Sequence, residues 1–386
     1  MKAVAPVNSL LLAAFLVGAL LEASWLGTVG AFSGNAVVIG AAVMLVLVNR
    51  AFEPLPLVGV LLALVCLAWS TAVNAADLGP DQLKAVALTA AVLPPFALRL
   101  RALNQRLALR LTGWVIGAGM VASLGLVAAG VSLAPLIASD PGAYAGEPLA
   151  MALFPNPNRA SHFYLVALLL ALAFAPGPRL RWLAVGVALA LILLTQARAT
   201  LGAAGIALGL YLLLHPDRPR PDPRRWRAIL AVPALLGLGL AAIAVAWPDA
   251  LAGFLQKVAN AGLSYRLTLW QLAGEALTAD PLTTALGQGA NTVALPLGDT
   301  TVTAHSAYLD TAVNLGLPYL GVTVLLTLAV TVTAWSRGER RLALLALPLM
   351  TVGAVASVLF AGAYPLWVLI AWSRLVLAPT VPRSAP

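Results

Sequence analysis

The sequence predicts an all-α, polytopic integral membrane protein with about 12 transmembrane helices and one long loop outside the membrane. Of its 386 residues, 61% are hydrophobic and only 10% are charged, and the mean hydropathy is +0.94. A soluble domain has roughly a quarter of its residues charged, so too little polar surface is present to coat one. The apolar residues come in runs of about 17 to 23, which is the length a helix needs to cross a bilayer core of ~30 Å.

These runs are expected to be helical because lipid offers the backbone no hydrogen-bond partners. Residues 1–386 are therefore treated as a single transmembrane domain, and its first apolar run is read as a membrane span rather than a signal peptide. Prolines in the third and fourth segments lie near the segment ends. There, neighbouring groups can replace the backbone hydrogen bond that proline cannot donate. The expected helices are 9–26, 33–49, 55–73, 82–98, 111–133, 160–175, 182–197, 199–214, 228–247, 307–335, 342–360 and 363–378.

The distribution of basic residues predicts the orientation, since cytoplasmic loops are enriched in Lys and Arg. With a cytoplasmic N-terminus, 18 of the 23 basic residues fall on the cytoplasmic side. Most acidic residues lie on the other side, which would be the periplasm. The 18 are Lys2, Arg50, Arg99, Arg101, Arg106, Arg110, Arg179, Arg181, Arg218, Arg220, Arg224, Arg225, Arg227, Arg337, Arg340, Arg341, Arg374 and Arg383.

Two periplasmic segments are too long to be simple turns. One spans residues 134–160 and is rich in Pro and Gly, and the other spans residues 248–306. Within the longer loop, 251–279 has helical periodicity and predicts an amphipathic helix at the membrane surface. Asp280-Pro281 and Gly287-Gln288-Gly289 are expected to end it and give loop. The expected apolar set is Leu255, Val258, Leu263, Leu267 and Trp270.

Several function classes are disfavoured by composition. The formal net charge is +9, but its basic cluster at 215–227 is read as a cytoplasmic topology signal, so no nucleic-acid partner is expected. Cys66, the single cysteine, lies in an apolar run and is read as a small core residue. No Asp, Glu and His cluster with metal spacing is visible, and a DxD-type nucleotide-sugar site is absent. No cofactor and no metal are therefore expected.

Basic residues on the periplasmic side are the candidates for function. Arg198 sits between two apolar spans with almost no loop, a costly position that favours an aqueous cavity over a snorkelling helix end. Arg266 lies on the amphipathic segment, where it could instead pair with lipid phosphate. Arg159 stands at the mouth of the sixth span, where Asn158 could be a helix cap. Lys84 opens the fourth span, and the last periplasmic cation, Lys257, is assigned to a solvated face.

His305 lies where the long loop enters the tenth span. Histidine titrates near neutral pH, so this residue is the natural candidate for a general base on the periplasmic side. Asp310 and Asp299 are near in sequence, and either could orient or charge the imidazole. His162 is expected to pack within a span, and His215 is expected on the cytoplasmic side.

Several arginines and a histidine on one outer face suit a lipid-linked diphosphate. The guanidinium group presents a planar fork that matches phosphate oxygens. Fixed cations can stabilise the charge that departs when a sugar–diphosphate bond is cleaved. A transporter of lipid-linked sugars is the competing class. Its key charges would be expected near the bilayer midplane, with matched broken helices, and neither feature is visible here.

The residues at this face resemble the O-antigen ligase family. The resemblance covers about residues 150–322 together with the layout of the spans. Each motif is short, but their order and their common side of the membrane agree with the family. The matching features are Asn156-Pro157-Asn158, Arg198, Arg266 with Trp270, Gly287-Gln288-Gly289, His305-Ser306, and Gly316 with Leu317-Pro318-Tyr319.

This resemblance implies a glycosyltransferase of the bacterial inner membrane, active at the periplasmic face. Its donor would be O-antigen polysaccharide on undecaprenyl diphosphate, and its acceptor a sugar hydroxyl of lipid A–core. His305 would be the general base, and Arg198 and Arg266 would hold the diphosphate. The family is metal-independent and inverts the anomeric carbon. Arg159 and Lys84 are added from topology alone as substrate-binding candidates.

Related activities stay open at this point. The same superfamily contains O-antigen polymerases, which use the same donor with a second lipid-linked chain as acceptor. It also contains protein O-oligosaccharyltransferases, which usually carry extra periplasmic material after the last span, whereas this sequence stops at Pro386. The stretch 308–321 favours the ligase.

Overall fold

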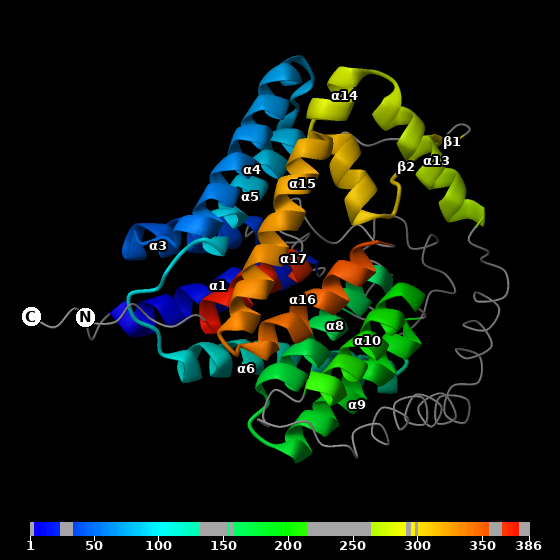
Figure 1. The fold of residues 1–386 in the computed structure, drawn as a ribbon. Coiled ribbons are helices and arrows are strands. Elements are labelled where there is room, and N and C mark those ends of the chain that lie inside the picture. The colour runs from blue at the N-terminus through cyan, green and yellow to red at the C-terminus, as the bar shows by residue number, and fades with distance from the viewer. Residues whose placement is uncertain are drawn as a thin grey trace, which may run out of the picture.

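The structure is a computed structural model of the full chain. It describes residues 4–23, 34–131, 153–154, 157–195, 197–214, 264–290, 295–297, 300–354 and 365–377. Every expected helix except 228–247, which lies outside these residues, overlaps an observed one, so the all-α class is confirmed. The helices are α1 Val4–Ala23, α3 Gly34–Asn49, α4 Pro54–Val73, α5 Pro80–Val92, α6 Gln105–Ala128, α8 Pro157–Phe174, α9 Pro178–Leu194, α10 Arg198–Leu214, α13 Ser264–Thr278, α14 Pro281–Leu286, α15 Ala307–Ser336, α16 Arg340–Gly353 and α17 Pro365–Leu377. Two 3-10 turns (η1 Ala75–Asp77 and η2 Pro94–Phe96) and the antiparallel hairpin of β1 Leu295–Leu297 and β2 Thr300–Val302 complete the described elements (Figure 1).

Four of the described helices are long and apolar enough to cross a membrane. They lie in α1, α4, α6 and α15, and α3, α8, α10 and α17 contain shorter apolar helices. The outer surface of α4 is apolar along its length, because Leu55, Val58, Leu62, Val65 and Trp69 are all more than 49% exposed. A soluble monomer rarely exposes so continuous an apolar patch. The chain is therefore membrane-embedded, while the number of spans remains a prediction.

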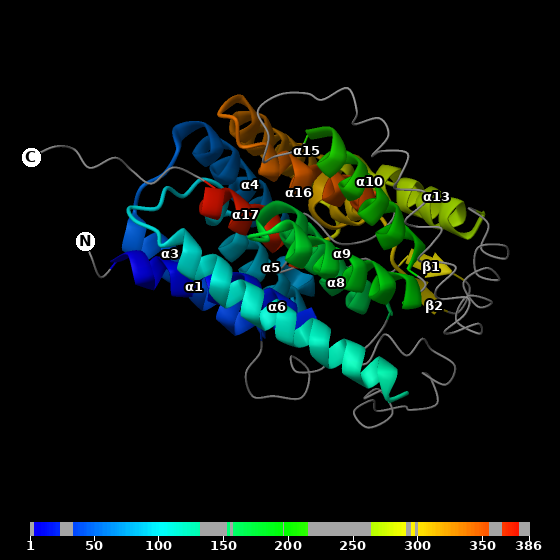
Figure 2. The ribbon, with the colours of Figure 1, turned by 90° about the horizontal axis from the view of Figure 1, so that it is seen from below.

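The helices pack as a bundle around α8, α16 and α17. Helix α1 packs against α3 and α6, as Figure 2 shows, and α8 packs against α9, α10 and α17. Helix α17 is buried over its described side chains, and Trp367 packs on Phe96 with ring centroids 4.6 Å apart. Buried asparagines add specificity: Asn8 and Asn49 exchange side-chain hydrogen bonds of 3.0 and 2.9 Å between α1 and α3.

The fourth expected helix, 82–98, is not continuous. Helix α5 ends at Val92, because Pro94 and Pro95 lack the amide hydrogen that a helix needs and disfavour helical conformation before them. The chain continues through η2 into an extended stretch that pairs with the start of α4. There Glu53 N donates to Ala97 O at 2.7 Å. The segment therefore does run back to the end of the bundle where α4 begins. It does so as the shorter helix α5 followed by η2 and an extended stretch.

The long loop also departs from expectation. Asp280-Pro281 ends α13 but starts a second helix instead of a loop, since the Asp280 carboxylate caps α14 by accepting from the amides of Leu282 and Thr283. Of the expected apolar set, Leu267 is 48% exposed and Trp270 is partly buried, while the buried residues of α13 are Leu269, Ala273 and Leu277. Leu255, Val258 and Leu263 lie outside the described residues. The β1–β2 hairpin was not expected.

Helix α15 bends at Gly316, which has φ 85° and ψ 160° inside an otherwise helical run. Figure 1 shows the bend beside α14. The carbonyls of Val313 and Asn314 are released from the helix there, and they accept from the amides of Gln288 and Gly289 at 2.8 and 2.9 Å. The backbones approach so closely that a Cβ on Gly316 would lie 2.2 Å from Ala285 O. Only glycine fits this contact.

Gly287 is the reciprocal half of the contact. It also has a positive φ, of 73°, and a Cβ there would lie 2.3 Å from the Asn314 carbonyl. We call this paired approach the Gly287–Gly316 contact. The two sequence motifs Gly287-Gln288-Gly289 and Gly316-Leu317-Pro318 are therefore linked in the structure, because each supplies one of the two glycines at which the backbones of α14 and α15 meet.

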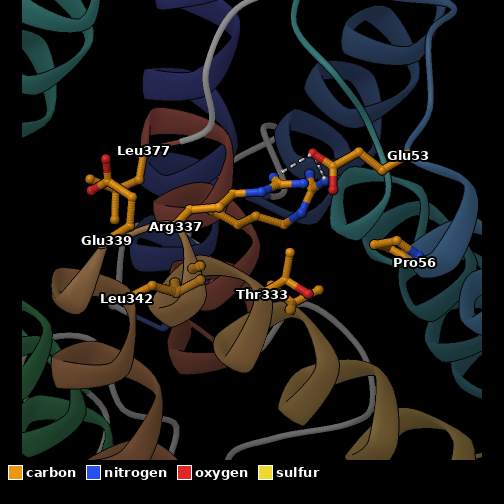
Figure 3. Close-up of a pocket in the computed structure, with 10 residues that line it drawn as sticks. Glu53, Pro56, Thr333, Arg337, Glu339, Leu342 and Leu377 are labelled. Carbon is orange, nitrogen blue, oxygen red and sulfur yellow. Dashed lines mark hydrogen bonds and ion pairs between the residues drawn. The ribbon is translucent and has the colours of Figure 1, made fainter.

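A charged cluster lies at the other end of α15. Arg337, at its C-terminus, points toward Glu53 (Figure 3), with 3.3 Å between its Nη1 and the Glu53 Oε1. Arg374 of α17 is 6% exposed and reaches the same oxygen at 3.2 Å. It also donates to Leu98 O at 2.7 Å. Glu53 therefore holds together the ends of α4, α15 and α17.

We expect Gly316→Ala to destabilise the protein strongly. The new Cβ would meet backbone atoms that cannot move independently, and a positive φ is costly for alanine, so a loss of about 2 to 4 kcal/mol is expected. The measurement is the thermal unfolding midpoint in detergent. Gly321→Ala is the matched control, since a Cβ on that glycine of the same helix meets nothing within 4 Å. Equal stability of the two variants would contradict the proposed joint.

Removing the charge of Glu53 should also destabilise the bundle. In Glu53→Gln the nearly buried Arg374 loses its counter-ion, and breaking such a pair costs about 3 to 5 kcal/mol. The control is Glu339→Gln, because Glu339 lines the same pocket and forms no ion pair within the described residues. Chemical denaturation in detergent compares the two. A midpoint for Glu53→Gln that matches the control would show that the cluster adds no stability.

Candidate functional site

Arg198 is placed by the tight turn between α9 and α10. Thr195 ends α9, and its hydroxyl donates to Ile192 O at 2.6 Å. The Thr195 hydroxyl also accepts from the Ala197 amide at 3.3 Å, and α10 then begins at Arg198, whose side chain is exposed. A cation at a helix N-terminus opposes the helix dipole, so helix stability does not account for it. The guanidinium and the amides of the first turn of α10 together favour an anion.

Helix α8 begins beside this turn. The Ser161 hydroxyl of α8 and the Thr200 hydroxyl of α10 lie 2.8 Å apart, which joins the first turns of the two helices. Arg159 is exposed in the same first turn of α8. Helix α8 starts at Pro157, so Asn158 is inside it and is not its cap. Its carbonyl accepts from Ser161 at 2.8 Å. Arg159 and Arg198 therefore stand on neighbouring helix ends.

Arg266 lies in the first turn of α13 and is half-buried. Burial lowers the pKa of its guanidinium from the usual value, and the positive charge of Arg198 lowers this pKa further. The two arginines, which come from distant parts of the sequence, are thus near enough to repel each other. Holding two like charges together costs free energy unless an anion comes between them.

Helix α13 is fixed against the loop that carries His305. Leu277 and Ala273 of α13 share an apolar cluster with Ala304 and Val313, and Trp270 packs against it. Trp270 is one turn along from Arg266 on the same helix. The cluster therefore ties the helix of Arg266 to the residue next to His305.

His305 has an unusual backbone conformation. Its φ is 52°, in the left-handed region, where residues other than glycine are uncommon. Its side chain is exposed. The following residue, Ser306, caps α15 by accepting from the Leu309 amide. His305 thus stands on a strained turn directly before the helix, and such strain is typical of functional sites.

Asp310 supports the backbone of the His305 turn. Its carboxylate accepts from the backbone amides on either side of His305, from Ala304 at 2.8 Å and from Ser306 at 3.3 Å. The expectation that Asp310 orients or charges the imidazole stays a prediction. Asp299, the other candidate, lies outside the described residues. The sequence did not indicate these backbone contacts, because five-residue spacing does not reveal which atoms meet.

Lys84 is set apart from these residues. It is exposed on α5, which packs against α3, α4 and η2, and not principally against the helices that carry the arginines. The described contacts therefore relate Arg198 to Arg266 and to the end of α8, while Lys84 stays a prediction from topology. His162, which was expected to pack within a span, lies within α8.

A pocket and possible metal sites are the other candidates for a functional site. The pocket in Figure 3 is formed at the C-terminal ends of α15 and α17, and its lining includes none of the candidate residues. Among the described residues, no group of three His, Cys, Asp or Glu side chains is arranged to hold a metal ion. Arg198 and Arg266, the latter on a helix that packs against the segment before His305, are thus the described residues best suited to binding an anionic substrate.

Comparison with known protein families matches one segment of the chain. Residues 183–324 match the family model described as O-antigen ligase. The matched segment contains Arg198, Arg266 and His305, whereas Arg159 and Lys84 lie before it. No curated protein sequence matches the chain. The resemblance predicted from the motifs is therefore confirmed for this segment, which matches the O-antigen ligase domain model.

Proposed function

We propose that the chain with this O-antigen ligase domain is a glycosyltransferase that moves O-antigen polysaccharide from undecaprenyl diphosphate to lipid A–core. The observation that carries the proposal is the nearness of Arg198 to Arg266, on a helix that packs against the segment before His305, within the stretch that matches the family model. A diphosphate carries the negative charge that would bind between two such cations. The setting would be the periplasmic face of a bacterial inner membrane, as the charge bias of the loops favours.

The arginines would bind the donor through its diphosphate. Each guanidinium can present two parallel N–H groups to phosphate oxygens, which gives direction as well as charge. Arg198 adds the amides at the start of α10. Arg159, on the neighbouring helix end, and Lys84 would serve as outer contacts to the donor. The polyprenyl chain would lie in the surrounding membrane lipid.

The reaction would be a direct displacement at the anomeric carbon. An acceptor hydroxyl oxygen attacks this carbon as the bond to the diphosphate oxygen breaks, and the bonding pair leaves with the diphosphate. His305 takes the hydroxyl proton as general base. The arginines stabilise the charge that develops on the departing diphosphate, so neither a metal nor a nucleotide is required. Attack from the opposite face inverts the configuration.

A polymerase reaction is the nearest alternative. It would use the same donor and the same displacement, with the end of a second lipid-linked chain as acceptor. The description of the matched family favours the ligase. The two reactions differ only in the acceptor, so a product assay separates them directly.

The two arginines should affect donor use more than stability. We expect Arg198→Gln or Arg266→Gln to lower kcat/KM for the donor by about 100-fold to 1,000-fold, because a cation at the leaving group is lost. Arg198→Lys and Arg266→Lys should recover only part of this, since the planar fork is missing. The control is Arg179→Gln, an exposed arginine at the start of α9. Wild-type kinetics in either glutamine variant would remove that arginine from the site.

His305→Ala should reduce transfer by about 100-fold to 10,000-fold while the protein stays folded. The assay uses purified protein in detergent, undecaprenyl-diphosphate glycan, lipid A–core, EDTA and no nucleotide. Glycan on lipid A–core with the wild type only would support both the ligase and the base. Lengthening of the donor with bare lipid A–core would mean a polymerase. Dependence on added Mg²⁺ or Mn²⁺ would overturn the metal-free reaction.

A further inference from the structure

We infer that Asp310 is the positioning residue of the His305 turn: its carboxylate fixes the backbone on both sides of His305 and thereby aims the imidazole. The inference rests on the proposed function for its catalytic meaning. The structural part, that Asp310 controls the placement of His305, stands on the described contacts alone. Asp310 itself would not touch the substrate.

The contacts enclose one residue. The Ala304 amide donates to Oδ1 of Asp310 at 2.8 Å, and the Ser306 amide donates to Oδ2 at 3.3 Å. Both carboxylate oxygens are thus engaged, each by a residue adjacent to His305. A carboxylate with two acceptor oxygens can do this, whereas a side-chain amide has only one acceptor and would turn N–H groups toward the other backbone amide.

The surroundings make the support rigid. Asp310 is 8% exposed, Ala304 is fully buried and Ser306 is 3% exposed, while His305 between them is exposed. Hydrogen bonds to a buried charge are stronger than those between neutral groups. The Asp310 amide also donates to Ser306 O at 2.8 Å, which closes the first turn of α15 over the same residues.

The need for such support comes from the conformation of His305. A left-handed φ of 52° costs about 1 kcal/mol or more for a residue with a Cβ, so the turn would relax to another conformation without compensating bonds. Relaxation would swing the Cα–Cβ bond and move the imidazole relative to the arginines. A displacement of about 1 Å can cost 100-fold in rate when a catalytic group must be aligned.

Two variants at adjacent positions test the inference. Asp310→Asn keeps the shape of the side chain but loses one acceptor. Thr311→Val is the control, because Thr311 is the next residue of α15, is 2% exposed, and its substitution leaves both amide contacts in place. Asp310→Glu keeps the charge with a longer side chain, and it replaces the asparagine variant if that protein does not fold.

The readout is the imidazole signals in nuclear magnetic resonance of histidine-labelled protein. The chain contains three histidines, His162, His215 and His305, so His305→Ala assigns one signal directly. We expect Asp310→Asn to shift or broaden the His305 signal and to leave the His162 signal, which reports on the inside of α8, unchanged. Thr311→Val should leave both unchanged.

The result that overturns the inference is equally direct. An unchanged His305 signal in Asp310→Asn means that the carboxylate does not set the imidazole. Equal changes at His162 and His305 mean that the substitution disturbs the whole bundle. This measurement needs no transfer activity, so it is independent of whether the proposed function is correct.

Kinetics then separate positioning from donor binding. Asp310→Asn should lower kcat by about 10-fold to 100-fold with the KM for the donor unchanged, because only the base is misplaced. The same substitution made in His305→Ala should lower the remaining rate little further, since the effect acts through His305. A raised donor KM with an unchanged kcat would overturn the positioning role.

Discussion

The bend of α15 at Gly316 is the constraint on which the site depends. It frees the carbonyls of Val313 and Asn314, and the amides of Gln288 and Gly289 bind them. This joint attaches the loop helices α13 and α14 to the membrane bundle through backbone atoms. The short first part of α15, which begins directly after His305, is oriented by the same bend. The contact between the two glycines therefore contributes to the placement of Arg266 and His305 relative to the bundle, together with the packing of α13 on α15.

The helix positions could be predicted because membrane spans leave a strong apolar signal over many residues. The orientation of single residues within the loop could not. Leu267 was expected on the apolar face of an amphipathic helix at the membrane surface, and this pattern did not reveal that the packing of α13 on β1 and α15 buries Leu269 and Ala273. The end of α5 could have been read from Pro94 and Pro95, where local geometry overrides hydropathy.

For the site, residue type and predicted topological side were informative, because few cations of this sequence fall on the side predicted to be periplasmic. They do not reveal which side chains meet. The nearness of Arg198 to Arg266 depends on the α9–α10 turn and on the docking of α13, and both require the folded chain. Asp310 was noticed for its spacing from His305, yet its partners are backbone amides, which no side-chain pattern records.

The paired bonds between residues 288–289 and 313–314 pin both ends of the chain segment between them. Closing a longer loop costs only about 0.6 kcal/mol for each doubling of its length. An insertion between β1 and β2 therefore need not move α15 or the His305 turn. The fold in this way separates a part of the chain that can change in length from the residues proposed for chemistry.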